Sequence, residues 1–171
     1  MSEHIELNPA THITVGTVGE PGNRTFFIQG SQGRTVISLI IEKAQAAMLA
    51  EGISSLLEDL QKDNPDLITP YDPSTLAVDL RFQDPVEHLF RVGNLGIGFN
   101  EDTNRIIIAA YELVEEGLEP SLVSFWGSIK QIQALVPHIQ STVKAGRPIC
   151  GNCGQPMDKD GHFCPKKNGY H

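Results

Sequence analysis

The chain has 171 residues, of which 40% are hydrophobic, and its formal net charge is −8. This length supports one domain of ordinary size with a small appendage. The acidic balance argues against a broad nucleic-acid surface, and no apolar run is long enough to cross a membrane.

The first half of the chain predicts a β-hairpin, a further strand and a helix. Residues 1–11 read as a loose, acidic lead-in without the features of a secretory signal. A hairpin is expected over 12–29, with its turn at 20–23, where a proline and a glycine favour a reversal. After a second turn at 30–33, an apolar strand is expected over 35–41 and a helix over 42–61. The helix is indicated by apolar residues at helical spacing: Leu49, Ile53, Leu56, Leu57 and Leu60.

Residues 62–87 break the periodicity with four prolines among several aspartates, which is typical of a connecting segment. We expect this connector to wrap the surface and to add a short edge strand over 76–80.

The second half predicts the same succession of elements. Strands are expected over 89–99 and 105–114 around a turn at 100–104, and a further strand over 122–126. A helix is expected over 128–144, capped by Ser128 and either kinked or broken by Pro137.

An internal repeat is therefore predicted, with 12–61 and 88–144 as its two units. Asn23-Arg24 opens the return strand of the first hairpin, and Asn104-Arg105 opens that of the second. Antiparallel hairpins share turn residues in any case, so a chance echo is the alternative. The predicted fold class is α+β: one six-stranded antiparallel sheet from two ββ(β)α repeats, with both helices packed on it. The groove between the repeats would be the default ligand site.

All three cysteines lie in the C-terminal tail, residues 147–171, which follows the α+β body of residues 1–146. Cys150 and Cys153 form a Cys-x-x-Cys pair, a spacing that directs two thiolates at one cation. His162 and Cys164 share a face on an extended segment and can reach the same ion. Three thiolates and one imidazole complete a tetrahedron, so the sequence predicts a closed, structural Zn²⁺ site in a zinc-ribbon-like tail.

Other interpretations of the tail remain open. A redox Cys-x-x-Cys pair usually opens a helix beside a βαβ unit, whereas this pair lies in a Gly/Pro-rich tail. The fourth zinc ligand could instead be His171 or Asp158. Because clustered thiols must stay reduced to bind metal, we expect the protein to be cytoplasmic.

The charge is unevenly distributed along the chain. Residues 144–171 carry five basic and two acidic side chains, a net charge of +3, whereas residues 1–143 carry 8 basic and 19 acidic ones, a net charge of −11. The basic tail predicts docking on the acidic body or on an acidic protein partner. Alternatively, its lysines balance the negative zinc thiolates.

Three segments resemble a bacterial, mainly actinobacterial, family known as a domain of unknown function. They are residues 15–27 (VGTVGEPGNRTFF), Glu42-Lys43, and the tail from Gly146 to Tyr170. Gly151 departs from the family pattern, which commonly has proline there, without removing a ligand. The resemblance implies that His162 is the fourth ligand, because the Gly-His-x-Cys-Pro box recurs as a unit, and it implies no particular activity.

The leading functional hypothesis is a non-enzymatic binding or adaptor protein whose zinc ribbon presents a basic surface to a partner. The alternative is an enzyme or sensor that binds a phosphorylated small molecule in the groove between the repeats, held by Arg24, Lys43 and Arg105. A third hypothesis is a zinc enzyme with three cysteine ligands and a metal-bound water. The sequence lacks a glycine-rich phosphate loop of known spacing, and His12, His88 and His138 are expected to be surface or hydrogen-bonded histidines.

Overall fold

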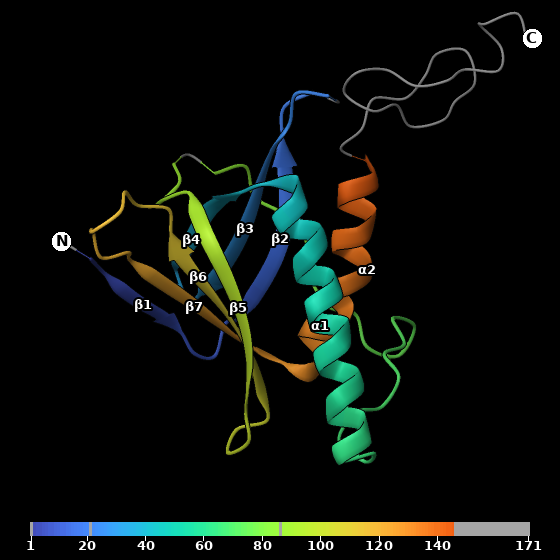
Figure 1. Cartoon of the computed structure of the whole chain (residues 1–171). Coiled ribbons are helices and arrows are strands. Elements are labelled where there is room, and N and C mark those ends of the chain that lie inside the picture. The colour runs from blue at the N-terminus through green and yellow to red at the C-terminus, as the bar shows by residue number, and fades with distance from the viewer. Residues whose placement is uncertain (1, 21, 86, 146–171) are drawn as a thin grey trace, which may run out of the picture.

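The protein is an α+β fold with seven strands in two sheets and two helices in the part of the chain described here (Figure 1). The computed structural model describes residues 2–20, 22–85 and 87–145, so the predicted zinc-ribbon-like tail lies outside the described residues. The elements are β1 (His4–Leu7), β2 (His12–Val18), β3 (Thr25–Gln32), β4 (Thr35–Ile41), α1 (Lys43–Asp63), β5 (Val92–Asn100), β6 (Arg105–Glu112), β7 (Leu122–Ser128) and α2 (Ile129–Ala145).

The expected single six-stranded sheet is wrong. The strands form a four-stranded sheet of order β1-β7-β6-β5 and a three-stranded sheet of order β2-β3-β4. The two sheets are joined by an isolated bridge between Ile40 and Arg91, and each buries its apolar face against the other and the helices. Two sheets that face each other across one core bury more apolar surface than a single open sheet, because the inner faces of both sheets are covered.

Two local expectations are also wrong. Residues 4–7, expected in a loose lead-in, form β1, which pairs in parallel with β7 from His4 opposite Leu122 to Leu7 opposite Phe125. Residues 76–80, expected as an edge strand, form no strand. A four-residue strand gives too little periodicity to be recognised, and its pairing is decided by β7, more than a hundred residues later.

The two halves have the same order of elements, three consecutive antiparallel strands and then a helix. The helices cross between halves: α1 packs against β5, α2 packs against β2, and the helices pack side by side (Figure 1). Each half therefore completes the core of the other, and buried residues from both form one cluster.

Both helices begin with the same local device. The Gln45 side chain accepts the Glu42 N–H at 2.7 Å, and the Gln131 side chain accepts the Ser128 N–H at 2.8 Å, so each helix start is closed by a capping box. The remaining amide group of each glutamine then reaches the other half. Gln45 donates to Val92 O at 3.2 Å, and Gln131 donates to Ala10 O at 3.2 Å. The predicted cap at Ser128 is confirmed, and α2 runs through Pro137 as one helix.

The two sheets come into contact where Phe125 of β7 lies over Gly30 of β3. Phe125 is fully buried, and a Cβ added at Gly30 would overlap its ring and crowd Leu7. Glycine therefore occupies this strand position because a backbone and an aromatic ring come into contact there.

A buried glutamine ties the connector to the three-stranded sheet. Gln29 is 1% exposed, and its amide donates to Gln83 O at 2.8 Å while its carbonyl accepts the Gln83 N–H at 3.0 Å. Both main-chain groups of Gln83 are thus satisfied by one side chain, which fixes the adjacent stretch of connector.

We expect Gln29→Leu to lower the free energy of unfolding by about 1–3 kcal/mol for each main-chain group left unpaired. Urea unfolding would measure the loss, and hydrogen exchange should accelerate at residues 80–84. Gln32→Leu is the matched control, because Gln32 lies on the same strand and makes an exposed hydrogen bond to Asn8 O. Equal stability of the two variants would show that the Gln29 contacts add nothing.

Candidate functional site

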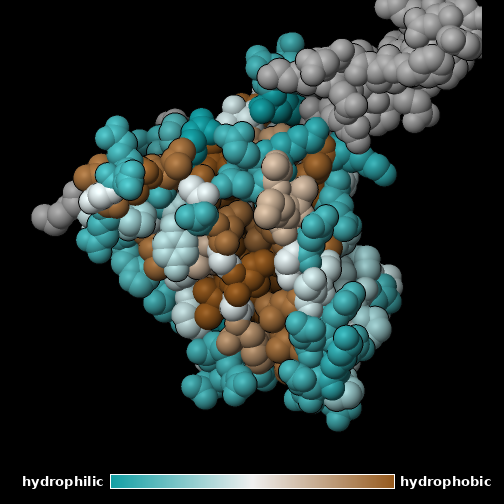
Figure 2. Space-filling model, in the orientation of Figure 1, coloured by the Kyte–Doolittle hydropathy of each residue, from teal (hydrophilic) through white to brown (hydrophobic). Residues whose placement is uncertain are grey.

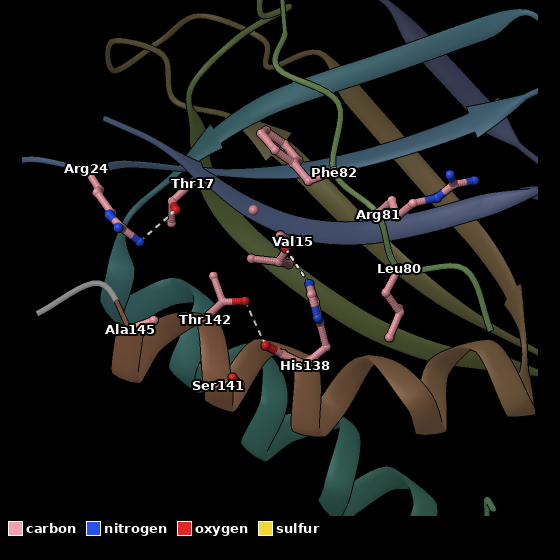
Figure 3. A pocket seen from close by; sticks show the side chains of 11 residues that line it. Val15, Thr17, Arg24, Leu80, Arg81, Phe82, His138, Ser141, Thr142 and Ala145 are labelled. Carbon is pink, nitrogen blue, oxygen red and sulfur yellow. Dashed lines mark hydrogen bonds between the residues drawn. The ribbon is translucent and has the colours of Figure 1, made fainter. Parts of the chain in front are cut away.

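A cleft of about 510 Å³ lies where the two halves meet (Figure 3). Its walls come from β2 of the first half, the connector, and the last turns of α2 of the second half. Its lining residues are Val15, Gly16, Thr17, Arg24, Leu80, Arg81, Phe82, His138, Ser141, Thr142 and Ala145. A volume of this size is typical of a small-molecule site. The predicted location of a ligand site, between the halves, thus contains an actual cleft.

The connector supplies an aromatic wall. Phe82 lies directly over Gly16, where any Cβ would overlap its ring, and it stacks on Phe27 with ring centroids 5.8 Å apart. The Gln29–Gln83 hydrogen bonds hold the neighbouring residue in place. Gly16 is therefore needed for the connector to lie flat on β2.

His138 joins α2 to β2 at the base of the cleft (Figure 3). Its Nε2 lies 2.9 Å from Val15 O and 3.3 Å from Thr14 Oγ1. A main-chain carbonyl only accepts, so Nε2 carries the proton and donates it. The Thr14 hydroxyl in turn donates to Leu80 O at 2.6 Å, which attaches the connector to the same point. The expectation that His138 is a hydrogen-bonded histidine is confirmed, and its role is to hold the three walls together.

Arg24 supplies the positive charge of the cleft. It follows the β2–β3 turn, and its side chain points towards the C-terminal end of α2 (Figure 3). Its Nη1 donates to Thr17 Oγ1 at 3.5 Å, and its Nε is shielded from solvent without a hydrogen-bond partner. In residues 2–145 as described, Arg24 forms no ion pair. A buried donor without an acceptor is costly, so this guanidinium is suited to bind an added acceptor.

Arg81 also lines the cleft, but its side chain points away from it (Figure 3). Its Nε and Nη2 donate to the two carboxylate oxygens of Asp79, both at 3.0 Å. These hydrogen bonds hold the pKa of Asp79 well below its ordinary value. The charge of Arg81 is thereby offset, and Arg24 is left as the unneutralised cation of the site.

The three predicted anion holders do not come together. Arg24 lines the cleft, whereas Lys43 opens α1 and is not one of the lining residues. Arg105 opens β6 opposite Ser128, at the start of α2, and its Nη1 donates to Asn8 Oδ1 at 3.3 Å. Arg24 and Arg105 have related positions in the sequence, but they lie at opposite ends of α2. The two halves therefore do not bring their equivalent residues together.

The predicted zinc ligands Cys150, Cys153, His162 and Cys164, and the alternatives Asp158 and His171, lie outside the described residues. Within residues 2–20, 22–85 and 87–145, no group of three or more His, Cys, Asp or Glu side chains is placed to hold a metal ion.

Sequence reasoning missed the connector's part in the site and the hydroxyls of Ser141 and Thr142 on α2. One signal was available for the connector: Phe82 is a large aromatic residue in a proline-rich segment that was expected to lie on the surface. The α2 hydroxyls carry no such signal, because a serine and a threonine near a helix end are ordinary surface residues.

The fold and the cleft define an α+β protein in which the helix of each half packs against strands of the other half. An open, ligand-sized cleft lies at their junction. The chain belongs to the family described as Protein of unknown function (DUF3090), whose match covers residues 5–164. No curated protein and no solved structure matches the chain. No helix among the described residues is long and apolar enough to cross a membrane.

Proposed function

We propose that this protein binds a small phosphorylated molecule in the cleft between its halves and acts as a binding or adaptor protein. The observation that carries the proposal is the side chain of Arg24, a cation without an ion-pair partner among the described residues, over a cleft of about 510 Å³. Residues 1–143 carry a net charge of −11, yet none of the described residues lining the cleft is a carboxylate. A cation retained there is suited to an anionic ligand.

The carbonyl end of α2 opposes this charge only in part. Ser141, Thr142 and Ala145 belong to the last turns of the helix, where the macrodipole amounts to about half a negative elementary charge. The guanidinium of Arg24 carries a full positive charge and presents paired donors that fit two phosphate oxygens. The hydroxyls of Thr17 on β2 and Ser141 on α2 add neutral donors from two walls of the cleft, whereas the Thr142 hydroxyl already donates to His138 O at 2.8 Å.

The remainder of the lining favours binding over catalysis. Leu80 and Phe82 provide an apolar surface for the uncharged part of a ligand. The Nε2 proton of His138 is occupied by Val15 O, so this nitrogen is not available as a general base. The lining residues therefore include recognition groups without a paired acid and base.

We expect Arg24→Gln to weaken binding of glycerol 3-phosphate about tenfold or more, because a charge-assisted contact contributes about 1.5–3 kcal/mol. Isothermal titration calorimetry would measure this, with inorganic phosphate as a second probe and uncharged glycerol as the negative one. Gln keeps a hydrogen-bonding amide and much of the side-chain length, so the variant removes mainly the charge.

Arg34→Gln is the matched control, since Arg34 is an exposed arginine in the β3–β4 turn, away from the cleft. Arg81→Gln should have a smaller effect than Arg24→Gln, because Arg81 is paired with Asp79. Equal binding by wild-type protein and Arg24→Gln, or equal binding of glycerol and glycerol 3-phosphate, would contradict the proposal.

A second part of the proposal concerns the tail. We infer that Cys150, Cys153, His162 and Cys164 hold one structural Zn²⁺, and that the basic tail engages an acidic protein partner or the acidic body. The family match supports treating tail and body as one unit, because it runs from residue 5 through Cys164. The tail begins directly after Ala145, which lines the cleft, so the two proposed sites adjoin along the chain. The need to keep clustered thiols reduced for metal binding supports a cytoplasmic location.

A further inference from the structure

Among the described residues, strand β5 is an edge of the four-stranded sheet to which no further strand is paired over Asn94–Asn100, and α1 packs beside it. It is nine residues long, Val92–Asn100, and its sequence VGNLGIGFN contains no charged residue and no proline. Folded proteins normally protect such edges with charges, prolines, short strands or a covering element, since unpaired N–H and C=O groups template pairing with another chain. Among the described residues, a side chain reaches just the first two carbonyls of β5, those of Val92 and Gly93, which accept hydrogen bonds from Gln45.

The other sheet edges among the described residues show the usual protection. β1 has only four residues and carries Glu6. β2 is covered by α2, with His138 bonded to Val15 O. β4 is bonded to the segment before β5, through Leu89 N–H to Ser38 O at 2.9 Å and Ile40 N–H to Phe90 O at 3.0 Å. The run Asn94–Asn100 is therefore exceptional in this fold.

An apolar groove runs beside this edge. Figure 2 shows hydrophobic surface exposed in the middle of this face, between β5 and α1. The groove has a volume of about 290 Å³, and the side chains of Met48, Leu49, Leu95 and Ile97 line it. Met48 is 69% exposed, the highest fraction among the large hydrophobic residues of the described part of the chain. A surface of this kind marks an interaction site.

We propose that β5 pairs antiparallel with β5 of a second copy of this chain, forming a two-fold dimer with one continuous sheet. The ends of the strand are complementary in charge: Arg91 precedes it, and Glu101 and Asp102 follow it. With the two-fold axis beside Gly96, the new ladder spans Asn94–Gly98, because Arg91 is already bridged to Ile40 of β4 and Gln45 bonds to Val92 O and Gly93 O. The acidic residues Glu101 and Asp102 of each copy then lie near Arg91 of the other, whose guanidinium also pairs with Glu42 at 2.8 Å. A parallel arrangement would instead place residues of the same charge next to each other, Arg91 by Arg91 and Glu101 by Glu101.

The face of β5 that carries Gly96 and Gly98 also permits close approach. A Cβ added at Gly98 meets nothing within 4 Å, and one at Gly96 meets only the Ala109 side chain at 4.0 Å. A stable dimer buries about 1,200–2,000 Å² in total, more than a strand pair alone supplies. The groove of Met48 and Leu95 lies on the same edge and provides the additional apolar contact. The dimer uses none of the cleft residues, so it is independent of ligand binding.

Sedimentation equilibrium of the full chain tests the proposal. Wild-type protein should form a dimer. Gly96→Lys should raise the dissociation constant of the dimer about tenfold or more, because two lysines would meet across the axis. Gly96→Glu should weaken it similarly, and mixing the two variants should restore dimers. Val36→Lys, an added lysine at an exposed position of β4, should leave the dimer unchanged.

The mixing step separates loss of the interface from misfolding, since unfolded variants would not restore each other. A measurement on the wild-type protein serves as a second test: amide exchange of residues 94–100 should slow as protein concentration rises. A wild-type protein that stays monomeric, a dimer that survives Gly96→Lys, or exchange at 94–100 that does not depend on concentration would overturn the proposal. Capture of an extended peptide by monomeric protein would likewise show that the edge serves a different partner.

Discussion

Phe125→Ala should lower the free energy of unfolding by about 3–5 kcal/mol. Phe125 is fully buried at the contact between the two sheets, and its ring lies against the backbone of Gly30. Because β3 and β7 are held in register by both neighbours, the surrounding backbone cannot collapse into the space that the ring leaves. The lost transfer free energy of the ring and the cost of the remaining cavity should therefore both lower the free energy of unfolding. Urea unfolding followed by circular dichroism measures the change.

A mutant cycle identifies the contact that is responsible. Gly30→Ala alone should destabilise by about 1–3 kcal/mol, because the added methyl group overlaps the Phe125 ring. In the Phe125→Ala background the same methyl group occupies vacant space, so its cost should vanish or change sign. Phe99→Ala is the size-matched control, since Phe99 is only half-buried on the edge strand β5. Additive effects of Gly30→Ala and Phe125→Ala would show that the sheets do not meet at this pair.

The same contact explains how far the fold can be read from the sequence. The strands of both hairpins and the two helices follow from local periodicity and turn residues, and their predicted ranges are close to β2–β4, α1, β5–β7 and α2. How the halves combine depends on non-local contacts such as Gly30 with Phe125, which no local pattern encodes. A glycine within a strand signals close approach without naming the partner.

The candidate site was predictable in place but not in composition. A groove between repeated halves was expected, and the cleft lies there, with Arg24 in it. Lys43 and Arg105 were grouped with Arg24 by sequence position, which assumes that the halves align side by side. Because α1 packs against β5 and α2 packs against β2, the halves do not align side by side. Arg24 therefore lies near the end of α2, and Arg105 lies near its start.

The capping glutamines, Gln45 and Gln131, are a further sign in the sequence that the two halves are related. Glu42 and Gln45, and Ser128 and Gln131, have the three-residue spacing of a capping box at corresponding helix starts. Each pair forms that box, and each glutamine also bonds to the opposite half. This pair of contacts is a stronger sign of duplication than shared turn residues, because hairpin geometry alone does not require it.

Cys164→Ser should abolish stoichiometric zinc binding by the purified protein. Structural sites of this ligand type bind Zn²⁺ with an apparent free energy of about 10–16 kcal/mol, and a serine hydroxyl does not replace a thiolate at neutral pH. The tail should lose its protection from proteases in the variant. The body should keep its stability within about 0.5 kcal/mol, because its strands and helices bury one apolar cluster among themselves. Metal analysis after dialysis against a chelator, with limited proteolysis, measures both effects.

Single substitutions of the candidate fourth ligands distinguish the possible coordination spheres. If His162 completes the site, His162→Ala should lose zinc while His171→Ala and Asp158→Asn retain it. If only the three cysteines bind the metal, His162→Ala should retain zinc, and cobalt substituted for zinc should show an exchangeable water. Retention of zinc by Cys164→Ser, or wild-type protein that never acquires zinc under reducing conditions, would contradict the site altogether. Because a closed sphere of four protein ligands has no position for a substrate, the His162→Ala result also decides between a structural ribbon and a zinc enzyme.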